Sequence, residues 1–168
     1  MIDHQAGYAA LMATASPDVT AGVPVGALMA RLGHEATARF RRALRPLDLR
    51  PQEFIVLKQL QAMGSTSQGA LADAVGVDYS NLATVAGGLC ERGLIARARD
   101  DADRRRYALE LSPAGRRLVE RADRAIAAGE DELLGALNPA EREEFSALLR
   151  QVADAAEICP TATARACA

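Results

Sequence analysis

The chain is poor in the residues on which many metal and redox sites depend. Its 168 residues include no Trp, two His and three Cys, which are Cys90, Cys159 and Cys167. The cysteines form no C-x-x-C pair, and the two histidines stand in no cluster of ligands. An odd number of cysteines fits a reducing compartment better than a disulfide framework. We therefore expect neither a zinc site nor a disulfide-rich secreted fold.

Long apolar runs and recognisable catalytic motifs are also missing. No run of about 18 apolar residues occurs, and the N-terminus has no basic stretch followed by an apolar one. No nucleophile-base pair, phosphate-binding loop or metal motif is present. The length suits one domain with one substantial core. These absences predict a cytoplasmic protein that is not an enzyme, holds no cofactor and contacts no membrane.

The charge of the chain is unevenly distributed. The net charge of -2 does not by itself indicate a nucleic-acid partner. Residues 92–124, however, contain ten Arg against six acidic residues, whereas residues 130–157 contain eight acidic residues against two Arg. The basic charge is concentrated in and around the segment for which a hairpin is predicted below.

Apolar spacing predicts a mainly α-helical domain. A first helix of about twenty residues starts at Pro24, and others are expected over residues 52–63 and 68–75. A short turn then leads to Asp78, a good N-cap residue for a helix that runs to Arg92 and is stopped by Gly93. Two short helices joined by a glycine-containing turn form a helix-turn-helix, whose second helix enters the major groove of DNA.

A small β-wing is predicted directly behind this second helix. Residues 94–98 and 107–111 alternate apolar and other side chains, as strands do. The sequence RDDADRRR between them is too polar to be buried and indicates an exposed hairpin tip. Ser112 and Pro113 then start another helix, whose apolar face continues to Asn138. Asn138 and Pro139 cap a last amphipathic helix, which is expected to pack against a second copy of the chain.

The run from Asp100 to Gly115 resembles the wing signature of the MarR family of bacterial transcription regulators. That signature is Asp, two variable residues, Asp-Arg-Arg, a short strand ending in Leu-Thr or Leu-Ser, and a Gly three residues on. The segments Asp78–Leu82 and Glu91–Ile95 also look like that family's recognition helix and its exit. The resemblance covers roughly residues 24–152.

The resemblance implies a homodimer with interleaved N- and C-terminal helices. Two winged helices would then read successive major grooves of a pseudo-palindromic operator in double-stranded DNA. Members usually repress transcription until a small ligand or an oxidant releases them. The expected organisation is an arm (1–22), a helical dimerisation region (23–50 and 112–158), a winged helix-turn-helix domain (51–111) and a tail (159–168).

The resemblance also assigns DNA-contacting residues. Arg105 matches the wing arginine that enters the minor groove, and Asp103 matches the carboxylate that braces it. Arginine suits a narrow, electronegative minor groove, and short polar side chains in a recognition helix can reach base edges. The alternatives are that Ser80 and Asn81 only reinforce the helix cap, and that the arginines form a solvated hairpin tip. The expected set is Ser67, Gln68, Asp78, Tyr79, Ser80, Asn81, Thr84, Asp103, Arg104, Arg105 and Arg106.

Gly87 and Gly88 depart from the family pattern. Each costs a helix interior about 1 kcal/mol relative to Ala. Two interpretations are open: the helix packs closely against a neighbour, or it is pliant. Either one weakens the case for phosphate contacts from its second half.

The family's effector usually lies between the first helices and the base of the winged domain. In this chain that region offers Arg31, His34, Arg39 and Phe54, which suit a small aromatic or anionic ligand. For His34 the alternative is a partly exposed helix histidine without a ligand. The absence of Trp argues against the urate-binding branch. Two other functions remain open: a thiol-based redox-responsive regulator, and a winged helix used only for protein contacts.

Overall fold

The computed structural model describes residues 22–99 and 107–156. The chain divides into two compact units, Met1–Thr37 and Ala38–Ala168, and the boundary falls inside one long helix, α2 (Val25–Leu44). In the first unit, the described turns of α2 leave Val25, Met29 and Leu32 exposed. Within the described ranges, no helix is both long enough and apolar enough to cross a membrane.

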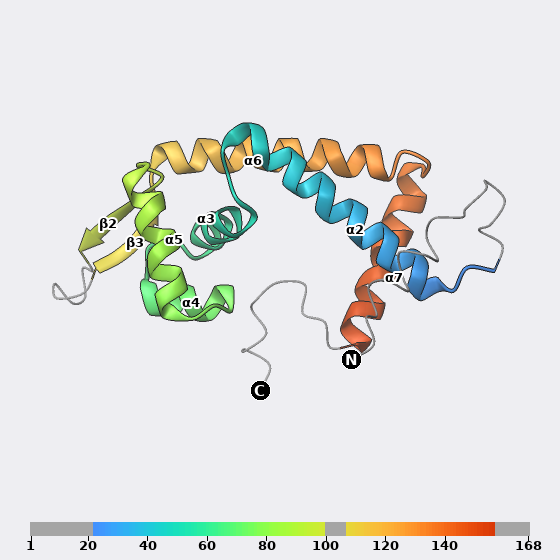
Figure 1. Cartoon of the computed structure of the whole chain (residues 1–168), viewed down its shortest axis with the longest axis horizontal. Helices are drawn as coiled ribbons and strands as arrows, with labels where there is room; N and C mark the ends of the chain where they lie inside the picture. Colours follow the sequence, from blue (N-terminus) through green and yellow to red (C-terminus); the bar gives the residue numbers. More distant parts are fainter. Residues whose placement is uncertain (1–21, 100–106, 157–168) are drawn as a thin grey trace, which may run out of the picture. The chain divides into compact units, whose positions relative to one another are not determined.

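The second unit is mainly helical with a small antiparallel sheet, which confirms the predicted fold class (Figure 1). The helix-turn-helix and the strand pair behind it are both present. After α2 come η1 (Arg45–Leu47), α3 (Pro51–Met63), β1 (Thr66–Ser67), α4 (Gln68–Val75), α5 (Tyr79–Glu91), β2 (Ile95–Arg99), β3 (Tyr107–Leu111), α6 (Pro113–Leu133) and α7 (Pro139–Ala155). Helix α3 starts one residue earlier than expected, β2 is shifted by one residue, α6 ends earlier, and η1 and β1 were not predicted.

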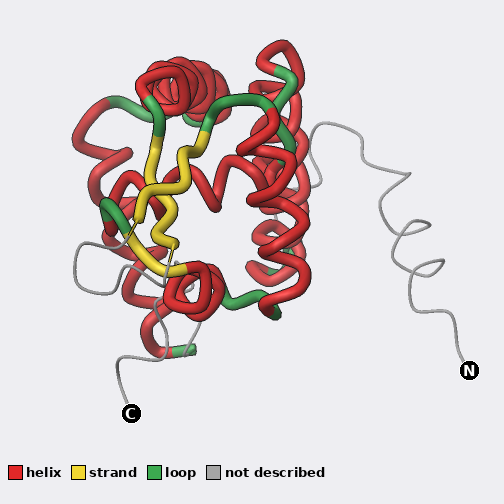
Figure 2. The backbone as a smooth tube through the Cα atoms, turned by 90° about the vertical axis from the view of Figure 1, so that its left-hand side faces the viewer, coloured by secondary structure: helices red, strands yellow, loops and turns green. Residues whose placement is uncertain are grey.

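The sheet contains one strand more than the sequence predicted. Its order is β1-β3-β2, with Thr66 opposite Leu109 and Ala96 opposite Glu110. Figure 2 shows the strands in yellow among the helices. β1 was not predicted because two residues are too few to show an alternating pattern. It forms only because β3 offers it an edge to pair with, and this pairing ties the start of α4 to the wing.

Aliphatic side chains from α3, α4, α5, α6 and the sheet form a single core. α5 contributes Leu82, Ala86 and Leu89, which are at most 1% exposed. Burying a leucine side chain stabilises a fold by roughly 1.5–3 kcal/mol. One face of α5 is therefore fixed against the domain, and the opposite face stays at the surface. The fully buried large residues are Leu44, Leu57, Leu60, Leu71, Leu82, Leu89, Leu109, Val56 and Val119.

α6 begins where predicted but ends earlier than expected. The Ser112 hydroxyl accepts from the Gly115 amide and caps the helix, with Pro113 at its first position. The helix stops at Leu133, although the apolar pattern suggested continuation to Leu137. Gly135 follows, and glycine has low helix propensity. The apolar residues beyond Leu133 therefore belong to a turn.

α7 is capped as predicted but buries no residue. Asn138 and Glu141 bond reciprocally as a capping box. Large apolar side chains of α7 nevertheless remain in contact with solvent: Leu148 is 53% exposed and Val152 51%. An amphipathic helix with its apolar face uncovered is incomplete within one chain.

Candidate nucleic-acid interface

A tight turn between α4 and α5 builds the helix-turn-helix. Gly76 adopts φ +75°, a left-handed conformation that favours glycine, and its amide donates to the Ala72 carbonyl to close α4. Two residues later Asp78 is extended and caps α5. This confirms the helix start predicted at Asp78.

The Asp78 carboxylate gathers the polar groups at the start of α5. It accepts from the Ser80 hydroxyl (2.5 Å), from the Asn81 amide N–H (2.9 Å) and from the Asn81 side-chain Nδ2. The hydrogen bond from Ser80, followed by that from the Asn81 backbone, lowers the pKa of Asp78 below its ordinary 3.8. In the free protein Ser80 and Asn81 therefore do reinforce the cap. Their roles in DNA contact stay predictions.

The outward face of α5 is lined by small groups. Ser80, Thr84 and Gly87 follow one another at helical spacing opposite the buried residues. The Thr84 hydroxyl donates to the Ser80 carbonyl at 3.1 Å, so it too has a local partner. The short side chains of Ser80 and Thr84 let the first turns of the helix approach a groove closely.

Gly87 and Gly88 are not packed against anything in the described part of the chain. A Cβ built on either residue has no neighbour within 4 Å. The interpretation that these glycines let α5 pack closely against another element of the chain is therefore wrong. The second half of α5 has open space on this side.

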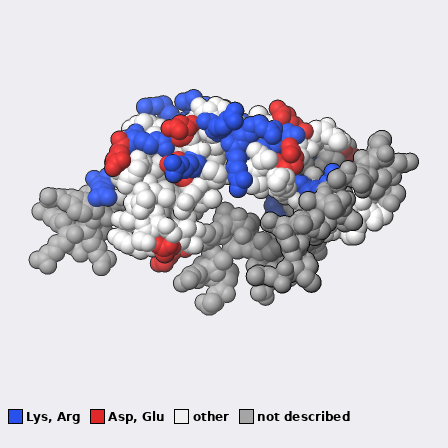
Figure 3. All heavy atoms as spheres, in the orientation of Figure 1, with Lys and Arg blue, Asp and Glu red and all other residues white. Residues whose placement is uncertain are grey.

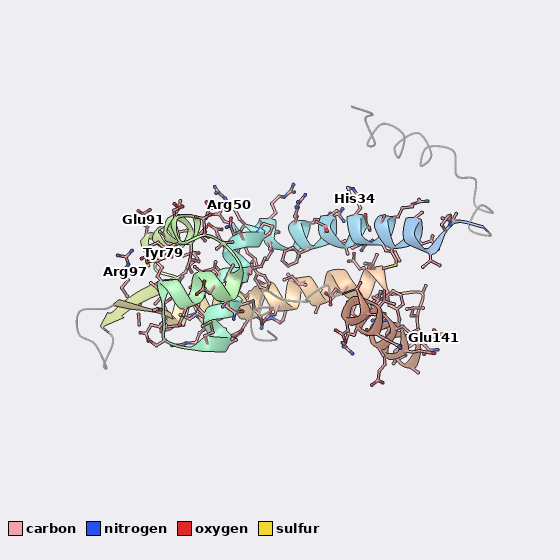
Figure 4. All side chains as sticks on the ribbon, turned by 90° about the horizontal axis from the view of Figure 1, so that it is seen from below. His34, Arg50, Tyr79, Glu91, Arg97 and Glu141 are labelled. Atoms are coloured by element: carbon pink, nitrogen blue, oxygen red, sulfur yellow. The ribbon has the colours of Figure 1, made fainter. Side chains whose placement is uncertain are left out.

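The remaining described candidates surround α5. Tyr79, at its first position, is 59% exposed. Ser67 caps α4, its hydroxyl accepting from the Ala70 amide at 3.2 Å, and Gln68 is the first residue of that helix. Arg97 is exposed on β2, and Figure 4 shows it at the same end of the unit as Tyr79. Arg97 falls in the predicted wing, and no role was predicted for it.

The tip of the wing lies outside the described residues. The described part of the hairpin ends at the backbone pair formed by Arg99 and Tyr107. The predictions for Asp103, Arg104, Arg105 and Arg106 therefore stay predictions.

Described basic residues gather elsewhere than on α5. Figure 3 shows Lys and Arg concentrated over α6 and the C-terminal half of α2, and the surface around α4 and α5 is mostly uncharged. Four of the ten arginines counted between residues 92 and 124 lie on α6 rather than on the wing. They are Arg116, Arg117, Arg121 and Arg124, and all are exposed.

A shallow cavity of about 160 Å³ lies between α2 and α6 in the second unit. Arg39, from the predicted effector set, lines it and forms an ion pair with Glu132 at 2.9 Å. Phe54 is not among the lining residues: it is buried in the core with its ring edge-on to Phe40. The cavity is lined by Arg39, Arg42, Ala43, Ala125, Ala128, Gly129 and Glu132.

Two other predicted sensing residues, Arg31 and His34, are exposed on α2 in the first unit, and their roles stay predictions. Cys90 is half-buried and packs against the core, and Cys159 and Cys167 lie outside the described ranges. No group of three His, Cys, Asp or Glu side chains in the described residues is placed to hold a metal ion.

Comparison with known proteins agrees with this geometry. The MarR family model matches residues 47–106. A protein of Thauera aromatica described as a transcriptional regulatory protein for the hcr operon is 31% identical over 135 residues, covering 78% of this chain and 81% of that protein. The chain belongs to the MarR family. It is a winged helix-turn-helix transcription regulator that binds DNA, and not an enzyme.

Solved structures of MarR-family relatives share the fold. BpsR of Bordetella bronchiseptica, studied for regulation of its DNA binding by 6-hydroxynicotinic acid, is 32% identical with a TM-score of 0.62. The match covers 79% of this chain and 94% of BpsR. Rv2887 of Mycobacterium tuberculosis, solved in complex with DNA, is 27% identical with a TM-score of 0.65. That match covers 77% of this chain and 97% of Rv2887. Rv2887 is named a transcriptional repressor.

Proposed function

We propose that this MarR-family protein is a homodimeric, cytoplasmic repressor that binds a pseudo-palindromic operator. The observation that carries the proposal is the capped helix α5, with its small polar outward face, followed directly by the β2–β3 hairpin. The repressor Rv2887, which has been solved with DNA, supports the same use of this fold.

In this proposal α5 enters the major groove and the wing enters the minor groove. The local hydrogen bonds of Ser80, Asn81 and Thr84 are then replaced by hydrogen bonds to base edges. An amide side chain has two N–H donors and one acceptor, so the bond to Asp78 leaves groups of Asn81 for a base. Arg105, braced by Asp103, inserts into the minor groove. Ser67, Gln68, Tyr79, Arg104 and Arg106 make the contacts to the DNA backbone that position the domain.

A second copy of the chain covers the exposed apolar face of α7. Leu148, Leu149 and Val152 all lie within five positions of one helix and are 41–53% exposed. A closed two-fold dimer would bury this face and present two α5 helices to two half-sites.

A small aromatic acid is the proposed effector class. The cavity is lined by Arg39, which is paired with Glu132, and by Arg42, whose guanidinium group suits a carboxylate. Its volume is similar to the roughly 150 Å³ of a protein cavity that binds benzene. The BpsR relative, whose DNA binding 6-hydroxynicotinic acid regulates, supports this class. Arg31, His34 and Phe54 remain predicted members of the effector region.

DNA binding by the full-length protein tests the proposal. The probe is a labelled duplex from upstream of the protein's own gene, titrated at several salt concentrations. We expect affinity to fall steeply with salt and Arg105→Ala to weaken binding roughly 10- to 100-fold, the scale of one good contact. Arg124→Ala, which removes an exposed arginine from α6, is the matched control and should bind like the wild type. Binding that is undetectable or insensitive to salt would refute the proposal.

The dimer is tested by charging the exposed face of α7. Leu148→Asp combined with Val152→Asp should give a folded monomer by light scattering, because a carboxylate cannot be buried unpaired in an interface. Loss of the second half-site contact should reduce operator affinity roughly 10²- to 10⁴-fold. Ile55→Asp changes a residue of α3 that is 46% exposed, and it should remain a dimer. A double variant that stays dimeric would show that α7 is not the interface.

A further inference from the structure

One side chain at the end of α5 bonds to a distant part of the chain. Arg92 donates from Nη1 to Glu53 Oε1 at 3.2 Å and from Nη2 to the backbone carbonyl of Asp48. These acceptors lie 39 and 44 residues earlier in the sequence. The planar guanidinium group donates to both acceptors at once. It therefore fixes the orientation of the end of α5 relative to these acceptors as well as its distance from them.

Both acceptors are themselves held in place. The other oxygen of Glu53, Oε2, accepts from the Arg50 amide at 2.8 Å and caps the start of α3. The Glu53 side chain is only 15% exposed. Asp48 has φ +48°, and its amide donates to the Arg45 carbonyl at 3.1 Å, so the turn that carries the accepting carbonyl is fixed. Arg92 is therefore bonded to a rigid junction between α2 and α3.

The second half of α5 is otherwise held mainly by apolar packing. Gly87 and Gly88 contribute no side chains there, Leu89 is fully buried and Cys90 packs against the core. Figure 4 shows this end, marked by Glu91, beside the start of α3, marked by Arg50. Arg92, as the C-cap residue of α5, is placed to limit tilting of the helix about Leu89.

We propose that Arg92 is a positioning residue for DNA recognition, which it serves by bonding to Glu53 and the Asp48 carbonyl rather than to DNA. By fixing the C-terminal end of α5 to the α2–α3 junction, it sets the angle at which the first turns of α5 meet the major groove. The inference rests on the proposed function, since it assumes that α5 reads DNA. It adds a residue outside the predicted contact set.

The rival role for Arg92 is a direct phosphate contact, and the two roles predict opposite effects at Glu53. If Arg92 binds phosphate, Glu53→Gln releases the guanidinium, removes a negative charge and strengthens binding. If Arg92 positions α5, the same substitution weakens its anchor and lowers affinity. A phosphate contact also contributes about one unit to the slope of log affinity against log salt, and a positioning residue contributes none.

The experiment measures affinity for the same upstream duplex by fluorescence anisotropy, using full-length Arg92→Gln, Glu53→Gln and the double variant. Arg92→Gln should weaken binding about tenfold, within the range of coupling between residues in one network. Glu53→Gln should weaken it by a smaller factor, and the double variant should be no worse than Arg92→Gln. The salt slope should not change. Arg92→Lys, which keeps the charge but loses the fork, should restore only part of the affinity.

Arg142→Gln is the matched control for a merely structural effect. Arg142 pairs with Asp131 in the α6–α7 region, and its side chain is 31% exposed against 32% for Arg92. Denaturant unfolding should show similar stability losses for the two glutamine variants, whereas only Arg92→Gln should lose affinity. Light scattering confirms that all variants keep the wild-type oligomeric state.

Each remaining outcome decides the question. Stronger binding by Glu53→Gln, a salt slope reduced by about one in Arg92→Gln, or unchanged affinity in Arg92→Gln overturns the positioning role while leaving the proposed function intact. If the wild-type protein itself binds no promoter DNA, the proposed function fails and this inference fails with it.

Discussion

The two ends of α5 are held by different kinds of contact. At the N-terminal end, Asp78 bonds to Ser80 and Asn81, only two and three residues away. At the C-terminal end, Arg92 reaches Asp48 and Glu53, and the Ser112 hydroxyl donates to the Gly93 carbonyl at 2.7 Å, 19 residues away. The first set of contacts is local, and the second joins distant segments.

Under the proposed function, this difference separates the part of α5 that reads bases from the part that positions the helix. The polar groups at the N-terminal end are exposed, so bases can compete for them without disturbing the rest of the domain. The contacts at the C-terminal end tie α5 to α3 and α6, so losing them changes where the whole helix lies. The specificity of DNA binding should therefore depend on the first turns of α5. The position of α5 in the domain should depend on its last helical turn and on the loop that follows.

The largest effect on stability is expected at Gly115, where α6 contacts the loop that follows α5. A Cβ added at Gly115 would lie 2.2 Å from the Leu94 carbonyl oxygen and 2.9 Å from Leu111 Cδ2. Because the nearer atom is backbone, α6 must shift away from the turn after α5. We expect Gly115→Ala to lower the free energy of unfolding by roughly 1–3 kcal/mol, measured by urea denaturation.

Gly69→Ala provides a close control for this prediction. Both glycines lie in the first turn of a helix capped by serine, but a Cβ at Gly69 has no neighbour within 4 Å. Gly69→Ala should be neutral or stabilising. If Gly115→Ala is as stable as the wild type, α6 can move away from the loop after α5 at little cost. The contact at Gly115 would then not fix the position of that loop.

The sequence was sufficient to predict the contacts that lie within a few residues of one another. Asp78, Ser112 and Asn138 were recognised as N-caps because a cap bonds to an amide three residues ahead. The link from Arg92 to Glu53 could not be found in this way, since nothing local marks two residues 39 apart as partners. Strand β1 was missed for the same reason, because it exists only through its pairing with β3.

A smaller effect, of opposite sign, is expected inside α5. Since a methyl group at Gly87 or Gly88 meets nothing, Gly87→Ala and Gly88→Ala should each stabilise the protein by about 1 kcal/mol. For a chain of this length that gain corresponds to a Tm increase of roughly 2–4 °C. Operator affinity should stay within about twofold, a change well below the 1.4 kcal/mol that corresponds to tenfold.

Gly33→Ala, at an open position in α2, is the control for helix propensity alone. It should raise Tm to a similar extent and leave DNA binding unchanged. If Gly87→Ala or Gly88→Ala instead weakens binding tenfold despite raising Tm, the second half of α5 lies against the DNA backbone. The division between a reading end and a positioning end would then have to be abandoned.

The effector region shows what residue type alone cannot distinguish. Phe54 was included because of its expected position near the first helices; it is only 8% exposed and packs against Phe40, and its role in effector binding stays a prediction. An aromatic residue that packs in the core and one that contacts a ligand have the same pattern in the sequence. Arg42 was not in the predicted set although it lines the cavity with Arg39, because a cluster of arginines at a helix end is also explained by the helix dipole.

The smallest effect is expected at the N-terminal cap and should depend on pH. Because hydrogen bonds from Ser80 and Asn81 lower the pKa of Asp78 below 3.8, ionised Asp78 stabilises the folded state above its unfolded pKa. That contribution is lost as pH falls through the lower folded pKa. Asp78→Asn keeps a capping side chain but removes the charge, so its Tm should lie slightly below that of the wild type at pH 7. The difference should narrow below pH 3.8. A Tm difference that is constant with pH would mean that the charge of Asp78 does not contribute, and that the cap acts through its hydrogen bonds alone. DNA could then bind Ser80 and Asn81 without removing partners from a stabilising charge.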